Sequence, residues 1–229
     1  MSILRLQAVS IKDGQRTLFS DLDLALNAGE RLVVFGPSGS GKLALLKTAA
    51  GILAPRAGTV VLEPGARAFP VGYVAREGGL VANITLLQNV MLPIVYHQKL
   101  TAKIAETKAK TLLFDLGVRE AAFQRPAAAP TSAKRMAQFA RALLAEPALY
   151  VIDSPFDDMD AAGALAVREV LDRIAQDSRA CSIVATGSLK PYLEWGGRFL
   201  MIHDDQIRHF AGREELLRDE DPQLKVFLS

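Results

Sequence analysis

Apolar and polar residues alternate along the first part of the chain. They do so over residues 3–9 and again over roughly 18–26, as in strands that have one face in solvent, and Asp13 and Gly14 supply a turn between them. These two segments predict a small antiparallel layer. Glycine and proline residues then lead into a further strand at residues 59–63.

A helical period replaces the strand pattern in the middle of the chain. From about residue 85 to 144, apolar residues recur at the spacing of an amphipathic helix. The residues that carry this period are Leu87, Val90, Met91, Ile94, Leu112, Leu113, Leu116 and Val118. The pattern predicts a helical insertion of roughly 60 residues, which follows a short strand within residues 66–80.

Strands return in the last third of the chain. Residues 148–153 and 181–186 are apolar strands, a helix at about 161–176 separates them, and a hairpin at 199–208 precedes a charged C-terminal helix. Strands that alternate with helices favour an α/β fold, in which a mainly parallel sheet is flanked by helices.

The composition is that of a globular chain, because 50% of the residues are hydrophobic. The length fits one large domain or two small ones, and we interpret residues 1–229 as a single domain. Within it, residues 1–81 and 145–229 are expected to form the core with its antiparallel layer. Residues 82–144 are expected to form a helical subdomain.

Charge and cysteine content exclude some classes of partner. A net charge of +2 gives no general case for nucleic-acid binding. Cys181 is the only cysteine, which excludes an intrachain disulfide and gives no reason to expect a disulfide-linked partner. The N-terminus lacks the pattern of a secretion signal, and no apolar run approaches the roughly 20 residues that cross a bilayer. We therefore expect a soluble or peripheral protein in the cytoplasm.

A glycine-rich loop follows the apolar strand at residues 31–35 and leads into a helix. Gly36, Gly41 and Lys42 have the spacing G-x-x-x-x-G-K, which lets backbone N–H groups surround a phosphate while a lysine adds positive charge. A working loop of this kind places a Ser or Thr hydroxyl on Mg²⁺ after the lysine, whereas this chain has Leu43. The loop is therefore predicted to hold phosphate but to lack a metal ligand. Its candidate binding residues are Gly36, Pro37, Ser38, Gly39, Ser40, Gly41, Lys42, Leu43 and Ala44.

Asp153 ends the predicted strand at residues 148–153. A carboxylate in this place beside a phosphate loop can hold a metal ion through its water shell. The alternative is an aspartate that ends the strand and caps local N–H groups. Because a phosphate loop lies upstream, we favour Asp153 as the candidate metal residue.

The order and spacing of several motifs resemble the ATP-binding subunits of ABC transporters, over nearly the whole chain. The segments that begin at Gly78, Ala133 and Asp221 are further similar to the lipid-transport branch that serves MCE (mammalian-cell-entry) proteins. Besides the glycine loop, the residues that carry the family resemblance are Ala50, Gly51, Gly58, Asn89, Pro93, Ala140, Arg141, Leu143, Glu146, Pro147, Val151, Ile152, Asp153, Pro155 and Asp160.

The resemblance implies a P-loop NTPase (RecA-like) core and ATP as the nucleotide. In the family, two nucleotide-binding subunits face each other head to tail, and each ATP lies between the phosphate loop of one and the signature segment of the other. The resemblance also implies a membrane permease as partner, with docking through residues of about 76–95, and a place on the inner face of the cell membrane. The second subunit is either a copy of this chain or a different one.

Three positions depart from the family where catalysis takes place. Ser154 stands where the family has a glutamate that polarises the attacking water, and serine is a poor proton acceptor at neutral pH. Arg76 aligns with a glutamine that contacts metal and water, and Gly187 with a histidine that contacts the γ-phosphate. We therefore expect no catalytic residue here and negligible hydrolysis. A further hypothesis is that Arg76 points inward and pairs with Asp153 in place of Mg²⁺. The alternative, which the sequence leaves open, is a solvated arginine in a loop with Gly78 and Gly79.

Residues 129–133 align with the family's signature, Leu-Ser-Gly-Gly-Gln, which opens a helix towards the opposite subunit's γ-phosphate. Pro130, Thr131 and Ser132 replace its serine and two glycines, which hinders close backbone approach and removes one N–H donor. Thr131 or Ser132 is still expected to cap the helix. These three residues and Asp160 are the candidate interface residues.

The losses affect both sites of a dimer. The phosphate loop of an intact partner would meet the altered residues 129–133, while its signature would meet this chain's depleted site. The aromatic side chain that stacks on adenine in the family is absent too, since Ile11, Lys12 and Asp13 occupy that region. The pattern favours a structural, regulatory or inhibitory subunit.

Three functions remain open from the sequence. We favour a non-hydrolysing subunit that docks on a permease and binds nucleotide through Lys42. The second is a transport ATPase whose partner or unusual residues rescue turnover, and the third is a stand-alone scaffold or regulator. Fold alone does not decide among them.

Overall fold

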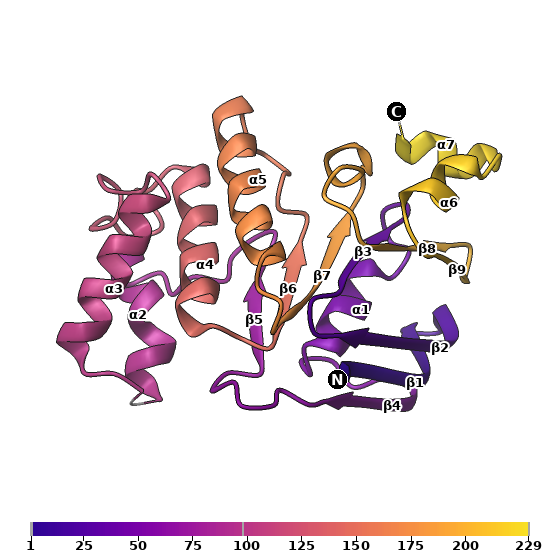
Figure 1. Cartoon of the computed structure of the whole chain (residues 1–229), viewed down its shortest axis with the longest axis horizontal. Coiled ribbons are helices and arrows are strands. Elements are labelled where there is room, and N and C mark those ends of the chain that lie inside the picture. The colour runs from indigo at the N-terminus through magenta and orange to yellow at the C-terminus, as the bar shows by residue number, and fades with distance from the viewer. Residues whose placement is uncertain (1, 98, 229) are drawn as a thin grey trace.

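The computed structural model describes residues 2–97 and 99–228, which form two sheets and a set of helices (Figure 1). The larger sheet has six strands in the order β5-β6-β7-β3-β8-β9, and all neighbours are parallel except β8 and β9. The predicted α/β fold with a mainly parallel sheet is confirmed. Its strands are β3 (Arg31–Phe35), β5 (Val71–Val74), β6 (Leu149–Asp153), β7 (Cys181–Thr186), β8 (Arg198–His203) and β9 (Gln206–Phe210).

A three-stranded antiparallel sheet lies beside the larger one, with β1 between β2 and β4. The predicted antiparallel layer is confirmed, and the strand predicted at residues 59–63 joins it, since Leu62 pairs with Leu4. Register shifts interrupt the pairing of the two long strands, and Ala8 and Asp21 have positive φ. The strands are β1 (Ser2–Asp13), β2 (Arg16–Asn27) and β4 (Ala57–Leu62).

Helices α2, α3 and α4 pack against one another at the end of the molecule that lies farthest from the antiparallel sheet (Figure 1). They fill the predicted helical stretch between β5 and β6; that residues 82–144 form a separate subdomain stays a prediction. The helices are α1 (Lys42–Ala49), α2 (Leu86–Tyr96), α3 (Ala102–Asp115), α4 (Thr131–Ala145), α5 (Ala161–Ala175), the 3-10 helix η1 (Lys190–Tyr192), α6 (Arg213–Arg218) and α7 (Pro222–Leu228).

Both faces of the parallel sheet are buried. In β3, Val33 and Phe35 join the core that includes α4 and α5, whereas Leu32 and Val34 join the core of the antiparallel sheet and α1. This division explains why the strand is apolar throughout rather than alternating. The carboxyl ends of the parallel strands meet at one edge, and the loops that follow them carry the candidate site residues.

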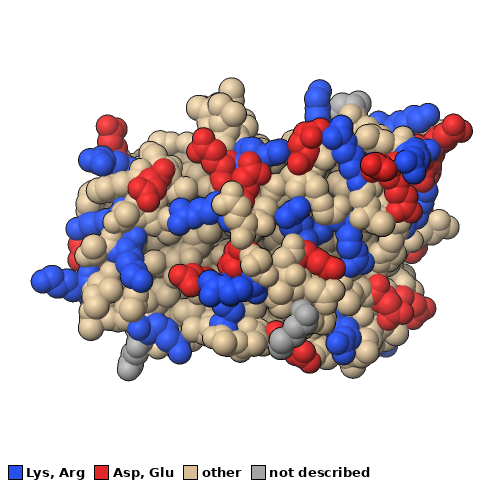
Figure 2. Space-filling model, in the orientation of Figure 1, with Lys and Arg blue, Asp and Glu red and all other residues tan. Residues whose placement is uncertain are grey.

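The C-terminal segment forms two short helices instead of the single charged helix predicted from the sequence. Asp219, the C-cap residue of α6, is extended, and Pro222 begins α7, as proline does at the first position of many helices. Arg208 of β9 forms ion pairs with Asp219 and Asp221. None of the described helices is both long enough and apolar enough to cross a membrane. Figure 2 shows basic and acidic side chains interspersed over the visible face.

Candidate functional site

The phosphate loop occupies residues 36–41, between β3 and α1. Gly36 has φ 149°, and a Cβ atom there would lie 2.1 Å from the carbonyl oxygen of Ile202. Gly41 caps α1 with φ 107° and no side-chain hydrogen bond. Gly36 is therefore required by close backbone contact and Gly41 by its positive φ, and the N–H groups of the first turn of α1 remain available to an anion.

Lys42 bends back over this loop. Its Nζ atom donates hydrogen bonds to the carbonyl oxygens of Gly36 (2.6 Å) and Pro37 (2.7 Å). Burial lowers the pKa of Lys42, while the charges of Asp153 and Asp157 raise it. The loop, the helix N-terminus and the lysine thus lie together as a phosphate site requires, although ligand binding by residues 36–44 stays a prediction.

Mg²⁺ does not fit the donors at this site. Leu43 lies in the first turn of α1 with 44% of its surface exposed and offers only carbon. Within residues 2–97 and 99–228, no group of three or more His, Cys, Asp or Glu side chains could hold a metal ion. Burial raises the pKa of Asp153, and the charges of Arg76 and Arg135 oppose that shift, so a cation approaching Asp153 meets two positive charges.

Ser154 follows the end of β6 in the left-handed region, at φ 46°. Its Oγ atom donates a hydrogen bond to Oδ1 of Asp153 (3.0 Å), and its N–H donates to the carbonyl oxygen of Ala185 (2.9 Å). Burial raises the pKa of Asp153, while the Ser154 hydrogen bond and the nearby arginines oppose that shift. The buried hydroxyl of Ser154 is therefore committed to Asp153.

Arg76 makes its ion pair with Asp157, from Nε to Oδ2 over 3.2 Å. The hypothesis of a direct Arg76–Asp153 ion pair is wrong for the described structure, since Asp153 is held by Ser154 instead. Arg76 still acts on Asp153 at longer range, because its charge lowers the pKa of that carboxyl.

Sequence reasoning missed Arg135, a residue of α4 that is only 2% exposed. Its Nη2 atom donates to the carbonyl oxygen of Arg76 (2.8 Å), and its Nη1 atom donates to those of Asp153 and Ser154 (both 3.3 Å). Gln138, one turn further along, accepts a hydrogen bond from the N–H of Ala75 (2.8 Å). The sequence did contain a sign of this role, because Arg135 and Gln138 are polar residues on the otherwise apolar, buried face of α4.

The altered signature segment leads into α4 by a route that differs from the prediction. Pro130 is the N-cap residue, in an extended conformation and without a side-chain hydrogen bond, so capping by Thr131 or Ser132 is wrong. The fixed φ of proline suits a residue that enters a helix and cannot donate. The helix itself forms as expected, and Pro130 and Thr131 are exposed. Their place at a subunit interface stays a prediction.

Gly187 lies beside open space at the end of β7, whereas Asp160 caps a helix. A Cβ atom on Gly187 would meet nothing within 4 Å, so there is free space for a side chain at the position that aligns with the family's histidine. Asp160 caps α5 by accepting a hydrogen bond from the N–H of Gly163 (2.7 Å). Its interface role also stays a prediction.

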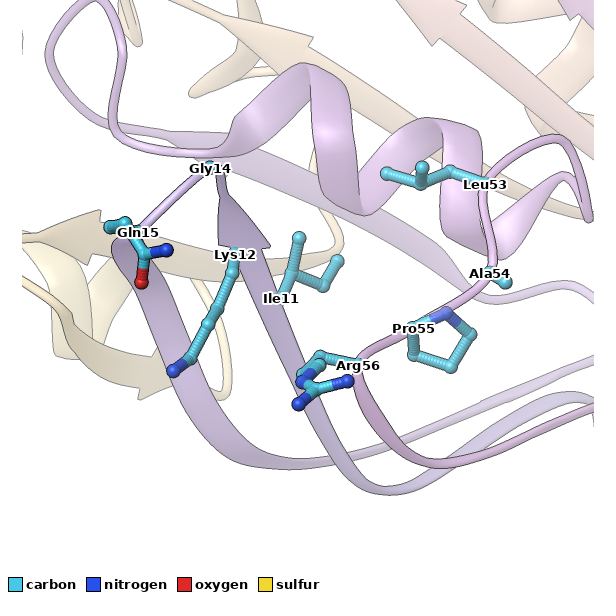
Figure 3. Close-up of a pocket in the computed structure, with 8 residues that line it drawn as sticks. All are labelled: Ile11, Lys12, Gly14, Gln15, Leu53, Ala54, Pro55 and Arg56. Atoms are coloured by element: carbon cyan, nitrogen blue, oxygen red, sulfur yellow. The ribbon is translucent and has the colours of Figure 1, made fainter.

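A pocket of about 460 Å³ lies between the β1–β2 turn and the loop after α1 (Figure 3). Among the described residues, no aromatic side chain lines it, and the sequence has no aromatic residue at positions 11–13. Lys12 and Arg56 supply two positive charges, and no acidic side chain within residues 2–97 and 99–228 lines the pocket. The remaining lining residues are Ile11, Gly14, Gln15, Leu53, Ala54 and Pro55.

The chain is similar to curated proteins that are described as ATP-binding proteins of import or transport systems. The aliphatic sulfonates import ATP-binding protein SsuB of Burkholderia thailandensis is 29% identical over 205 residues, which cover 89% of this chain and 59% of that protein. SsuB 2 of Burkholderia cenocepacia is 31% identical over 215 residues, with 90% and 78% covered. The intermembrane phospholipid transport system ATP-binding protein MlaF of Haemophilus influenzae is 25% identical over 238 residues, with 99% and 90% covered.

Solved structures agree on the fold. The ATP-binding cassette MJ0796, in a dimer with ADP and Pi, matches with a TM-score of 0.81 at 20% identity over 91% of this chain and 98% of that chain. A putative metal-chelate type ABC transporter matches with a TM-score of 0.82 at 19% identity over 99% and 89%. The family model described as "ABC transporter" matches residues 19–157, so the chain belongs to the ABC transporter family.

Proposed function

We propose that this chain is a nucleotide-binding subunit of an ABC transporter that binds ATP without hydrolysing it and docks on a membrane permease. The observation that carries the proposal is the pair at the end of β6, where the Ser154 hydroxyl donates to Asp153 and no glutamate follows the aspartate. A positioned general base is worth roughly 10²–10⁴ in rate.

Other features of the site point the same way. The residues that follow Lys42 carry no hydroxyl for a metal ion, and Pro130 removes an N–H donor from the segment that would face a partner's nucleotide. The phosphate loop itself keeps its glycines and its lysine. These features support retained binding and lost turnover at both composite sites of a dimer.

Residues of about 76–95 are the surface that we assign to permease docking. Asn89 is buried and ties this loop to α2, since its side chain accepts a hydrogen bond from the N–H of Val81 (2.7 Å) and donates to its carbonyl oxygen (3.0 Å). Leu92, Val95 and Tyr96 of α2 leave apolar surface exposed beside it. A loop that is hydrogen-bonded to a helix with exposed apolar side chains suits a protein partner.

Phospholipid is the substrate class that we assign to the transporter, because the relative MlaF is described as part of an intermembrane phospholipid transport system and is matched over 90% of its length. The proposal places the subunit on the inner face of the membrane, beside a second nucleotide-binding subunit.

The test combines binding and turnover. A fluorescent ATP analogue is titrated into the purified chain and into Lys42→Ala, and phosphate release is measured in parallel. We expect binding that falls at least tenfold in Lys42→Ala, with release at the buffer background. Steady phosphate release from the pure chain would instead identify a transport ATPase. Absence of an integral-membrane partner in a membrane extract would favour a stand-alone scaffold.

A further inference from the structure

We propose that this nucleotide site works without a divalent cation, because two arginines of the chain itself neutralise the carboxylates beside the phosphate loop. The ligand is then a metal-free nucleoside polyphosphate. The inference rests on the proposed function, since it requires that nucleotide binds at Lys42.

Asp157 lies between two positive side chains. Its Oδ2 atom pairs with Nε of Arg76 at 3.2 Å. Burial lowers the pKa of Lys42, and the charges of Asp153 and Asp157 oppose that shift, so Asp157 also acts on Lys42. The two carboxylates are therefore close to the phosphate-binding lysine. Left alone, they would repel a bound nucleotide.

Arg135 supplies the second positive charge from inside the protein. It is 2% exposed, and its hydrogen bonds go to backbone carbonyl groups rather than to a carboxylate. A guanidinium group does not lose its proton in a protein, so the charge is permanent. Burial lowers the pKa of Arg135, and the charges of Asp157, Asp153 and Asp158 oppose that shift, so its positive charge acts on all three carboxylates.

Arg135 also fixes the position of Arg76. The hydrogen bond from Nη2 of Arg135 to the carbonyl oxygen of Arg76 holds the backbone at this point, although Gly78 and Gly79, both at positive φ, follow closely. The Arg76 side chain therefore extends towards Asp157 from a backbone position that is held in place. The three cations Lys42, Arg76 and Arg135 balance the three acids Asp153, Asp157 and Asp158.

With the charges balanced, the site neither holds Mg²⁺ well nor needs its charge beside the phosphates. In a working P-loop site, Mg²⁺ bridges the phosphates and is held by a hydroxyl and an acid. Here Leu43 offers no hydroxyl, and Mg²⁺ at Asp153 would be repelled by the two guanidinium groups. The phosphates meanwhile face carboxylates that are already neutralised.

The experiment titrates a fluorescent ATP analogue into the full chain, once with EDTA and once with Mg²⁺. The test variant is Arg76→Gln, and the control is Arg218→Gln, which removes an exposed positive charge that pairs with Glu214 on α6. We expect the wild-type affinity to agree within about threefold between the two buffers. Arg76→Gln should lose about tenfold in EDTA and recover part of that loss in Mg²⁺, whereas the control should match the wild type.

A second variant isolates the charge effect. Adding Asp157→Asn to Arg76→Gln removes the carboxylate that the first change left unpaired, so metal-free binding should return to within about threefold of the wild type. Thermal melts of all variants verify that each one folds.

Two results overturn the inference and leave the proposed function standing. One is a wild-type affinity that Mg²⁺ raises tenfold or more, and the other is an Arg76→Gln variant that behaves like Arg218→Gln. Absence of nucleotide binding in both buffers would overturn the inference and the proposed function together.

Discussion

The hydroxyl of Ser154 donates a hydrogen bond to Oδ1 of Asp153 over 3.0 Å, although Ser154 is held in the left-handed region. The two residues satisfy each other at the end of β6, beside the phosphate loop. A serine hydroxyl that donates to the carboxylate has no basic group to offer water.

The stability of the protein is predicted to depend on pH through Asp153. Burial is the largest influence and raises the pKa of this carboxyl above its ordinary value. Folding therefore favours the protonated form of Asp153. The stability that this form contributes is fully present below the pKa of Asp153 in the unfolded chain, and it is lost as the pH rises through the pKa in the folded protein. Asp153→Asn keeps the acceptor for Ser154 without the charge, and should raise Tm at pH 7 by about 2–4 °C, as about 1 kcal/mol does in a chain of this size.

Thermal melts at several pH values would check this prediction. The advantage of Asp153→Asn should shrink at acidic pH, where the wild-type carboxyl is protonated as well. Asp205→Asn, at an exposed turn, is the control and should leave Tm unchanged at every pH. A gain that stays constant down to about pH 3 would contradict a titration at Asp153.

Arg135 is predicted to matter more for stability than any exposed charge near it. Arg135→Met keeps much of the length of the side chain but leaves the carbonyl oxygens of Arg76, Asp153 and Ser154 without its hydrogen bonds. We expect a loss of about 2–4 kcal/mol in the free energy of unfolding, measured by urea denaturation. Lys134→Met, at the neighbouring position of α4, should change it by less than about 0.5 kcal/mol.

The sequence revealed the parts of the site that are local in the chain. Gly36, Gly41 and Lys42 lie within one strand–loop–helix unit, and their spacing alone predicts the loop that the structure contains. Arg135 could not be found in this way, because its acceptors are 18, 19 and 59 residues away and come together only when α4 packs on the sheet.

The wrong predictions have similar physical causes. The hypothesis that Arg76 pairs with Asp153 fails because the choice between two aspartates four residues apart depends on the loop geometry after β6. The cap of α4 was expected at Thr131 or Ser132, and Pro130 took that place because its restricted φ starts the helix one residue earlier.

Alanine substitutions at two glycines of the phosphate loop are predicted to destabilise the protein by different amounts, because one causes a steric clash and the other only backbone strain. Gly36→Ala would bring Cβ to 2.1 Å from the carbonyl oxygen of Ile202, so β8 must shift. We expect a loss above about 2 kcal/mol in the free energy of unfolding. Gly39 has φ 76° and open space, so Gly39→Ala should cost only the roughly 1–2 kcal/mol of a left-handed residue. Equal losses in denaturant melts would show that the Ile202 contact is not decisive.

Recognition of the nucleotide base is predicted to be weak, because the described side chains that line the pocket beside the β1–β2 turn include no aromatic ring. ATP and GTP should therefore bind within about threefold of each other. Stacking of a base on an aromatic ring is worth about 1–3 kcal/mol, so Asp13→Tyr should tighten ATP binding by about fivefold or more. Asp13→Ala controls for the lost charge, and tripolyphosphate, which has no base, should bind Asp13→Tyr and Asp13→Ala equally. If Asp13→Tyr and Asp13→Ala bound ATP with the same affinity, the base would lie away from this turn.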